Sequence, residues 1–545
     1  MFRFDDSPML YLVIGNLLLL LTGVASFYPF LNFKGFQNKN FIIVVVGLYL
    51  STLIILRLPV VVFNQVLNPD ENLFIVGAMT LAQDPIYWES VDGCTSGPFN
   101  FYIITFFCQV FNQPYDYISA RMIGILLMAG SILFSFAALK KLFSTDIAFS
   151  SIFPAVAFLS TTRYFDFVHF SSEHLPIFLL SIIAYLYATI FKQVYPKSST
   201  AFIFGLVAGS IIFTKLQAIP IALFLTVTAY WLIYDKSKKF FTVQTLMLTI
   251  GGILVPLCLL LMAFWYDFAD KIWIYYLKNN LSYGNNTNIF NTIYESLFDE
   301  TNIFIRLIVV LSTILLIVNL LIKKQIKPTP QSAFLITFLL STVLAVYKTG
   351  FVFHHYLLFL IFPTVFLYAF FLQDLIHFSK KYFSMGFLSV VSIITLSNSF
   401  IYPLKNHFVT NHQQRQLPIS LTGKEIIKYS KPNEPLVVWG DAGILYLETK
   451  RRQGIRWSNS HWGMYSDSLQ KLFQEEFIKE FKLEPFPVFI DAHPTKGTFM
   501  TRDKLGYETV APLKEIIDKN YQFIGEFDEQ RVFVRNERLE EINKK

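Results

Sequence analysis

The stretch LNPDENLFIVGAMTLAQDPIYWESVDGCTSGPFNFYII, from Leu67 to Ile104, carries the main clue to how this chain is built. Two adjacent carboxylates, Asp70 and Glu71, follow a long apolar segment, and a loop rich in aromatic and polar residues comes next. Charge beside an apolar segment is costly when that segment lies in a membrane, so an ionisable residue there indicates a function. The first question is therefore whether the apolar segments cross a membrane.

Composition answers that question. The 545 residues are 54% hydrophobic and 15% charged, with a mean hydropathy of +0.48, whereas soluble domains carry about a quarter charged residues. The apolar residues form runs of about twenty, the length that crosses a hydrocarbon core of roughly 30 Å. The runs predict a polytopic all-α membrane protein with about twelve spans. These are expected near 9–31, 41–64, 116–138, 147–162, 175–192, 201–215, 217–234, 243–264, 303–322, 332–349, 356–375 and 385–404.

Lysines between the spans predict the orientation. They fall in alternate loops, and positive loops face the cytoplasm. The N-terminus and the loop that opens at Asp70 are then expected on the outer face. The net charge of +7 reflects these anchors and gives no support for nucleic-acid binding. The lysines are Lys34, Lys39, Lys140, Lys141, Lys192, Lys197, Lys236, Lys238, Lys239, Lys323, Lys324, Lys327, Lys380 and Lys381.

The chain changes character after about residue 405. Charged residues become frequent, and PLVVWG (435–440) and PVFIDAH (487–493) have the pattern of short buried strands. Helical periodicity covers 466–481 and 513–519, and 521–536 alternates about a polar turn like a terminal hairpin. We therefore predict a membrane domain over 1–404, with an outer catalytic loop over 65–115, and an outer-face α/β domain over 405–545.

Several kinds of chemistry have no motif here. Three cysteines, Cys94, Cys108 and Cys258, make neither a disulfide framework nor a metal motif. No P-loop, GxGxxG or HExxH pattern is present. No cofactor is predicted, although a divalent metal beside Asp70 and Glu71 stays open without a complete ligand set. Sparse cysteine and compact outer loops favour a bacterial inner membrane, with the outer domain in the periplasm.

Further polar residues collect on the predicted outer face. TTRYFDFVHFSSEHLPIF (161–178) brings Arg163 and Glu173, FTKLQ (213–217) brings Lys215, and YKTGFVFHHYLL (347–358) brings His355 and Tyr356. Transfer of a group from a lipid phosphate needs a carboxylate to accept the proton of the acceptor hydroxyl. It also needs cations to stabilise the departing phosphate. This set of side chains suits both requirements.

Other interpretations of the same residues stay open. Asp70 can serve as an N-terminal cap for a helix over 72–82, and Ser172 or Glu173 can cap the next span. Arg121 and Lys215 can snorkel to the membrane surface. For the whole chain, the main alternative is a polytopic transporter or lipid flippase, and a second is a non-catalytic assembly subunit that binds a partner through its outer domain. Transporters often have two related halves and midplane charges, and neither feature is evident here.

The chain resembles the GT-C class of polytopic glycosyltransferases, which includes lipid A aminoarabinose transferases and protein O-mannosyltransferases. The resemblance rests on an ordered set of motifs over Arg57 to about residue 404 and extends loosely to the outer domain. The motifs are RLPVVVFNQVLNPDE (57–71), TSGPFNFYII (95–104), ARMIG (120–124), SSEHLP (171–176), GLVAGSIIFTKLQA (205–218) and HHYLLFLIFP (354–363).

The resemblance implies a GT-C fold and inverting transfer of a sugar from a polyprenyl-phosphate donor to a lipid, glycan or protein acceptor. Asp70 would be the general base, and Glu71 would position the base or the acceptor. Glu173 would match the acidic residue of the second outer loop, with Lys215, His355 and Tyr356 near the donor phosphate.

Two departures from the family pattern stand out. Some members have Lys-Pro-Pro where this chain has Ser96-Gly97-Pro98, so Arg163, Arg121 or Lys215 would have to replace that lysine. The first span, 9–31, is additional to the usual plan.

Overall fold

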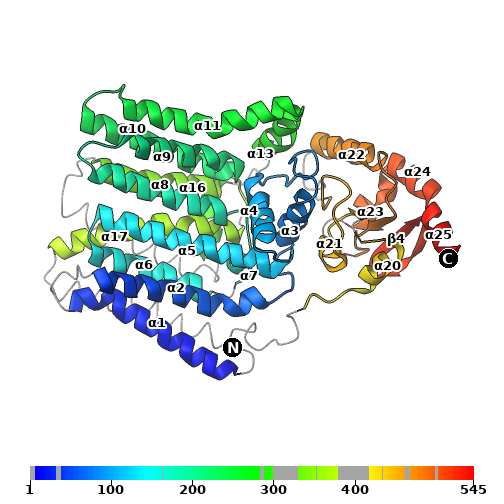
Figure 1. Cartoon of the computed structure of the whole chain (residues 1–545), viewed down its shortest axis with the longest axis horizontal. Helices are drawn as coiled ribbons and strands as arrows, with labels where there is room; N and C mark the ends of the chain where they lie inside the picture. Colours follow the sequence, from blue (N-terminus) through cyan, green and yellow to red (C-terminus); the bar gives the residue numbers. More distant parts are fainter. Residues whose placement is uncertain are drawn as a thin grey trace. The chain divides into compact units, whose positions relative to one another are not determined.

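The computed structural model describes residues 7–31, 39–162, 164–282, 288–298, 329–351, 353–378, 416–432, 434–460, 467–496 and 501–544. The chain forms two compact units. The bundle unit comprises Met1–Val62, Gly124–Trp265 and Gly284–His412, and the α/β unit comprises Phe63–Ile123, Tyr266–Tyr283 and Gln413–Lys545. Colour along the chain in Figure 1 shows that each unit is assembled from separate stretches of sequence.

Long apolar helices lie side by side in the bundle unit (Figure 1). In the described part of the chain, eight helices are long and apolar enough to cross a membrane, and three apolar helices are shorter. The predicted spans 303–322 and 385–404 lie outside the described residues. The long helices are α1 (Pro8–Leu31), α2 (Lys39–Val62), α5 (Tyr117–Leu142), α8 (His174–Lys192), α10 (Ile219–Ser237), α11 (Val243–Trp265), α16 (Pro330–Tyr347) and α17 (Leu358–Phe378). The shorter apolar helices include α6 (Thr145–Thr161) and α9 (Ser198–Ser210).

Short segments connect these helices. The break between α9 and α10 contains the 3-10 turns η1 (Ile211–Phe213) and η2 (Leu216–Ala218). The helix α7 (Phe165–Val168) precedes α8, η5 (His354–Leu357) precedes α17, and α14 (Ile289–Phe298) lies before α16 along the chain. These connections carry most of the polar residues that the sequence singles out in this unit.

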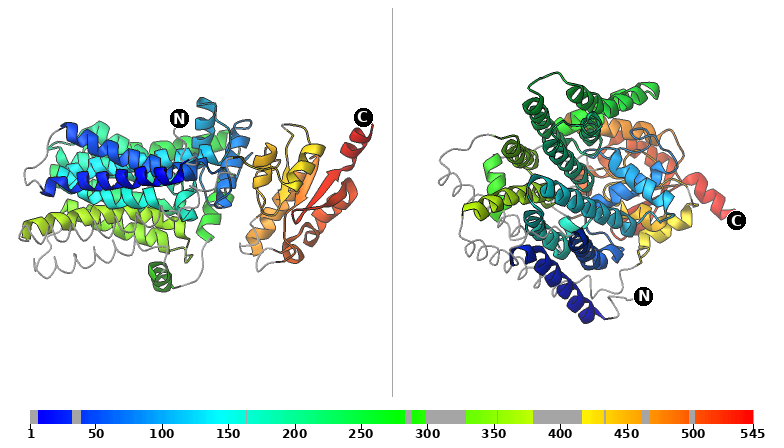
Figure 2. Two further views of the ribbon diagram at one scale, coloured as in Figure 1. Left: turned by 90° about the horizontal axis from the view of Figure 1, so that it is seen from below. Right: turned by 60° about the vertical axis from the view of Figure 1, so that its left-hand side comes forward.

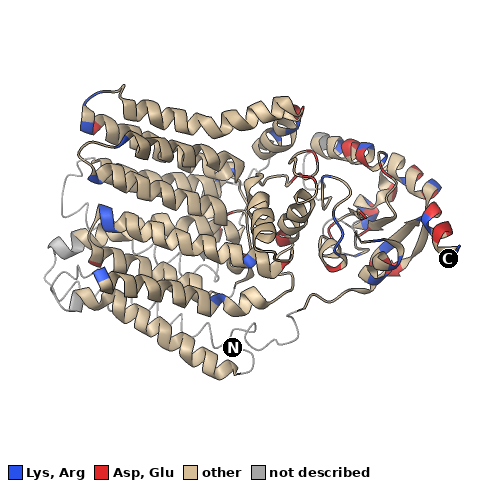
Figure 3. Ribbon diagram, in the orientation of Figure 1, with Lys and Arg blue, Asp and Glu red and all other residues tan. Residues whose placement is uncertain are grey.

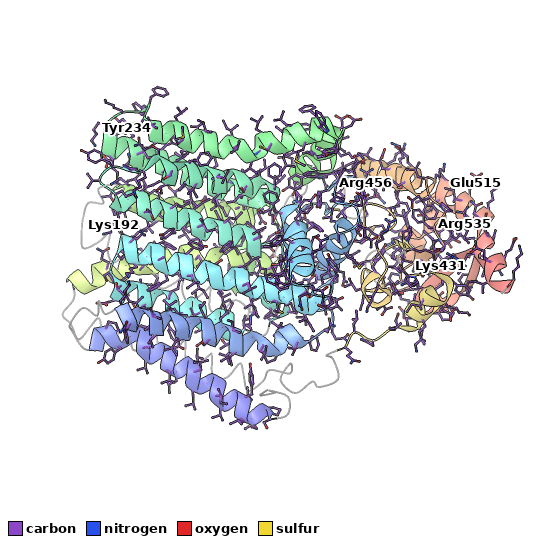
Figure 4. All side chains as sticks on the ribbon, viewed as in Figure 1. Lys192, Tyr234, Lys431, Arg456, Glu515 and Arg535 are labelled. Carbon is purple, nitrogen blue, oxygen red and sulfur yellow. The ribbon has the colours of Figure 1, made fainter. Side chains whose placement is uncertain are left out.

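Charged residues sit at the helix ends of the bundle unit, while the helix bodies are largely uncharged (Figure 3). Lys140 and Lys141 lie in the last turn of α5, and Lys192 lies in the last turn of α8. Lys192 and Tyr234 of α10 are at the same end of the bundle (Figure 4). This placement is what the alternating lysines lead one to expect.

The additional first helix is joined to the bundle by hydrogen bonds between helices. The hydroxyls of Thr22 and Thr52 are 2.7 Å apart, and those of Ser26 and Tyr49 are 2.9 Å apart. Tyr49 also donates to the carbonyl oxygen of Phe149 on α6 at 2.9 Å. Small hydroxyl side chains let apolar helices approach and hydrogen-bond to one another, so α1 is an integral part of this unit.

Close packing of glycines joins α9 to α11. A Cβ atom at Gly205 would lie 2.0 Å from the carbonyl oxygen of Leu248, and one at Gly209 would lie 2.3 Å from that of Gly252. Such small-residue contacts allow two backbones to touch without an intervening side chain. The rest of α11 exposes large apolar side chains, among them Leu246 and Leu261.

The α/β unit contains a four-stranded sheet in the order β1-β2-β4-β3. The strands are β1 (Val437–Trp439), β2 (Val488–Asp491), β3 (Tyr521–Phe527) and β4 (Gln530–Arg535). The pair β1 and β2 is parallel, with Val438 opposite Ile490, and the other pairs are antiparallel. The two predicted strands and the terminal hairpin are confirmed.

Helices flank this sheet (Figure 2). The predicted helix over 466–481 is α22 (Asp467–Phe481), and the one over 513–519 is α24 (Ala511–Asn520). The others in this part are α20 (Leu421–Tyr429), α21 (Ile444–Thr449), α23 (Arg502–Leu505), η8 (Tyr507–Thr509) and α25 (Asn536–Asn543).

Earlier stretches of the chain belong to the same α/β unit. They contribute α3 (Asp70–Leu81), α4 (Phe99–Val110), α12 (Ala269–Lys271), the π-helical η3 (Ile272–Lys278) and α13 (Asn279–Ser282). The side-chain amide of Gln453 donates to the carbonyl oxygen of Ser90 at 3.0 Å. A Cβ atom at Gly443 would lie 2.6 Å from that of Asn72. The loop that starts at Asp70 is therefore packed against the C-terminal part of the chain.

Candidate active site

Asp70 is the first residue of α3, and its side chain is exposed. Its backbone N–H donates to Oδ1 of Asn68 at 2.9 Å, which shapes the turn before the helix. Pro69 occupies the N-cap position and makes no side-chain cap hydrogen bond. Among the described residues, no hydrogen bond or ion pair involves the Asp70 carboxylate. The side-chain cap considered for Asp70 is thus absent, and its carboxylate is available to a ligand.

Glu71 has the opposite environment. Its carboxylate is fully buried and faces Arg121 of α5 in a two-point ion pair, with Nε–Oε1 at 2.8 Å and Nη2–Oε2 at 2.5 Å. Arg121 also donates to the carbonyl oxygens of Phe63 and Gln65. The pair therefore holds the chain that leads into Asp70. The side chain of Arg121 is buried in this network, so the snorkelling alternative does not describe it.

Lys215 and Glu173 form a second buried ion pair, which lies in the bundle unit. The Lys215 ammonium also donates to Oγ of Ser172 at 2.8 Å and lies 4.5 Å from the ring centre of Tyr356. Two hydrogen bonds leave one of the three ammonium protons for another acceptor. Lys215 is buried and paired, so snorkelling does not describe this residue either.

Backbone geometry explains how these two side chains meet. Lys215 is extended, with φ −158° and ψ 124°, between η1 and η2, so the chain turns there instead of continuing α9. Glu173 stands at the N-cap of α8, but its side chain makes no cap hydrogen bond. Burial alone raises the pKa of the Glu173 carboxyl, but the Lys215 ammonium, assisted by His355, outweighs this effect and holds that pKa below its usual range. Glu173 is accordingly an anion in this cluster.

Two histidines and a tyrosine complete the cluster in the bundle unit. The ring of His355 lies perpendicular to that of Tyr356, with centroids 4.8 Å apart, and perpendicular to that of His169 at 5.9 Å. His355 and Tyr356 are both buried, at the start of the segment that leads into α17. Arg163, the remaining predicted member, lies outside the described residues.

A metal beside Asp70 and Glu71 would meet an incomplete set of ligands. Both Glu71 oxygens accept from Arg121, which leaves the Asp70 carboxylate as the ligand at that position. Within the described ranges, no group of three or more His, Cys, Asp or Glu side chains is arranged to hold a metal ion.

Asp92 is a polar residue of the loop that sequence reasoning did not single out. It is buried in the α/β unit, where its Oδ1 accepts from the Cys94 N–H at 2.9 Å and its Oδ2 from Nε1 of Trp457 at 3.0 Å. Its own backbone N–H donates to the carbonyl oxygen of Arg456 at 2.7 Å, a residue labelled in Figure 4. An isolated aspartate in a polar loop carries no signal that would reveal this environment.

Burial raises the pKa of Asp92 to about 6, against the lowering effects of the Cys94 N–H and Arg456. Between about pH 4 and pH 6 the folded state then binds more protons than the unfolded state, so stability falls as pH rises. We expect the thermal midpoint of the wild type to drop over this range relative to that of Asp92→Asn, measured by fluorescence at both pH values. If the thermal midpoints of the two proteins changed by the same amount between the two pH values, the raised pKa of Asp92 would be contradicted.

Comparisons with known proteins identify the fold. No protein-family model matches the chain, and no curated protein matches it either. ArnT from Cupriavidus metallidurans, solved with bound undecaprenyl phosphate, is similar over 90% of this chain and 97% of its own, with a TM-score of 0.57 and 12% identity.

Two archaeal structures are more distant. The oligosaccharyltransferase of Archaeoglobus fulgidus is similar over 90% of this chain and 74% of its own, with a TM-score of 0.46 and 12% identity. AglB from the same organism, solved with an inhibitory peptide and a dolichol-phosphate, is similar over 88% and 74%, with a TM-score of 0.45 and 12% identity. The likeness to ArnT confirms the predicted GT-C fold with its C-terminal α/β part.

Proposed function

We propose that this chain is a membrane glycosyltransferase that moves a sugar, with inversion, from a polyprenyl-phosphate donor to a lipid, glycan or protein acceptor. The proposal includes an outer-face site, in the periplasm of a bacterial inner membrane. The observation that carries it is the contrast between two adjacent carboxylates. Asp70 is exposed and without a partner among the described residues, whereas Glu71 is buried against Arg121. The buried ion pair of Glu71 with Arg121 thus holds the backbone that carries Asp70.

In the proposed reaction Asp70 is the general base. Its carboxylate takes the proton of the acceptor hydroxyl as that oxygen attacks the anomeric carbon of the sugar. The new glycosidic bond forms on the face opposite the departing oxygen, and the bond between the sugar and the phosphate breaks. The electron pair of that bond leaves with the polyprenyl phosphate. Rigid support of the base favours this step, because proton transfer requires hydrogen-bond reach.

Lys215 supplies the cation proposed for the donor phosphate. Its remaining ammonium proton suits a phosphate oxygen, and a charge-assisted hydrogen bond of this kind is stronger than one between neutral groups. Ser172 and Glu173 hold the ammonium in place. The aromatic ring of Tyr356 further stabilises the positive charge through a cation–π contact.

A transfer assay with the purified chain in liposomes tests the proposal. Polyprenyl phosphates that carry hexoses or pentoses are supplied with candidate acceptors, and mass spectrometry measures release of the bare polyprenyl phosphate. We expect release that depends on both the donor and the protein. Movement of a labelled donor between leaflets without loss of its sugar would instead identify a lipid flippase.

A further inference from the structure

His169 is a buried histidine to which neither the sequence nor the proposed reaction gives a role. It follows α7 and is 0% exposed. Its Nδ1 lies 2.9 Å from the carbonyl oxygen of Phe165. A carbonyl oxygen only accepts, so Nδ1 carries a proton in this contact, and in the neutral ring with this tautomer Nε2 is an acceptor.

Nε2 of His169 has no hydrogen-bond partner in the described structure, although the atom is buried. Buried polar atoms are nearly always satisfied, so an unsatisfied one requires an explanation. Leaving such an atom without a partner costs free energy that a bound ligand recovers. The missing partner must be a donor, because the Nε2 of the neutral ring can only accept.

The surroundings of His169 indicate the ligand. Its ring stands 5.9 Å from that of His355, which adjoins Tyr356, and Tyr356 covers the Lys215 ammonium. The ring that carries this acceptor atom thus lies beside the cluster that we assign to the donor phosphate. An ionised phosphate diester offers only acceptor oxygens, whereas the sugar next to it offers hydroxyl donors.

We propose that Nε2 of His169 accepts a hydrogen bond from a hydroxyl of the sugar carried by the polyprenyl-phosphate donor. This assignment rests on the proposed function and adds to it a residue that contacts the sugar and not the lipid. Binding of the donor then satisfies the buried ring nitrogen, and a donor without that hydroxyl leaves it unsatisfied. Sites that hydrogen-bond a substrate hydroxyl discriminate strongly against analogues that lack it.

Two substitutions of His169 distinguish the role of Nδ1 from that of Nε2. In His169→Asn the amide N–H can replace Nδ1 and keep the bond to Phe165, but nothing reaches the position of Nε2. In His169→Gln the longer side chain places an amide oxygen near the position of Nε2. Binding of a polyprenyl-phosphate hexose and of bare polyprenyl phosphate to each variant is measured by native mass spectrometry, with His174→Asn as a buried control in the same segment.

We expect His169→Asn to weaken binding of the sugar-bearing lipid about tenfold while binding of bare polyprenyl phosphate is unchanged. His169→Gln should lie closer to the wild type, and His174→Asn should leave the ratio of the two affinities unaltered. In a series of deoxy-sugar donors tested on the wild type, one donor should bind about tenfold more weakly than the complete sugar donor. This measurement does not depend on the folding of a variant.

Equal weakening of both lipids by His169→Asn would place the imidazole at the phosphate and overturn the assignment. So would unchanged affinities in a folded His169→Asn, or a deoxy series without a weakened member. If the wild type bound neither lipid, the proposed function itself would fail, and that result is distinct from the others.

Discussion

Replacing Asp70 by Asn is expected to lower turnover by about a hundredfold or more while the protein still inserts into the membrane and binds donor lipid. Asn has the shape of Asp but cannot accept the proton of the acceptor hydroxyl. The exposed side chain makes no ion pair among the described residues, so stability should change little. Initial rates of polyprenyl phosphate release, together with the thermal midpoint, check both parts.

Two control variants sharpen this test. Asp84→Asn removes another exposed carboxylate of the same loop and should leave the rate unchanged. Glu71→Gln takes the partner from the buried Arg121, and breaking a buried pair costs about 3–5 kcal/mol of stability. That variant should lose thermal stability before it loses specific activity. If Asp70→Asn lost stability and kept its specific activity, Asp70 would have a structural role only.

Lys215→Met is expected to weaken donor binding by about tenfold to a hundredfold, the usual effect of losing a charge-assisted hydrogen bond. The variant also leaves Glu173 as a buried anion without its cation, which costs about 3–5 kcal/mol of stability. Affinity for polyprenyl phosphate and the thermal midpoint should therefore both fall. Measured alone, these two losses do not separate ligand binding from folding.

The double variant Lys215→Met/Glu173→Gln separates them. It removes both charges of the pair, and replacing a buried pair by neutral groups is often close to neutral for stability. The thermal midpoint should return toward that of the wild type, while affinity for the donor phosphate should stay low. Wild-type donor affinity in this double variant would show that the pair is structural and that the phosphate binds elsewhere.

Local patterns were enough to predict much of the fold. Runs of about twenty apolar residues indicate membrane spans because the bilayer sets that length, and the eight long apolar helices of the described part agree with them. The short strands β1 and β2 and the helix α22 were also predicted, since alternation and helical periodicity are properties of neighbouring residues. No element was predicted between 265 and 298, where α12, η3, α13 and α14 lie.

Candidate site residues were identifiable as charges in apolar surroundings, but their partners were not. Glu71 meets Arg121, 50 residues away, and Glu173 meets Lys215, 42 residues away. Such pairs depend on the rotation and depth of separate helices, which local periodicity does not specify. Two adjacent acidic residues in a sequence likewise do not reveal that Asp70 is exposed and Glu71 is buried.

Apolar runs along the chain are sufficient to specify the class of fold, because their length and spacing follow from the thickness of a bilayer and act within each segment. Which charged groups are neutralised and which are available depends on contacts between distant segments and is seen in the folded chain. The tertiary structure brought Asp92 to Trp457 across 365 residues, and it left Nε2 of His169 without a partner in the described part of the chain. The physical reason is that burial and hydrogen bonding arise from contacts between segments, and these contacts set the chemistry of each side chain.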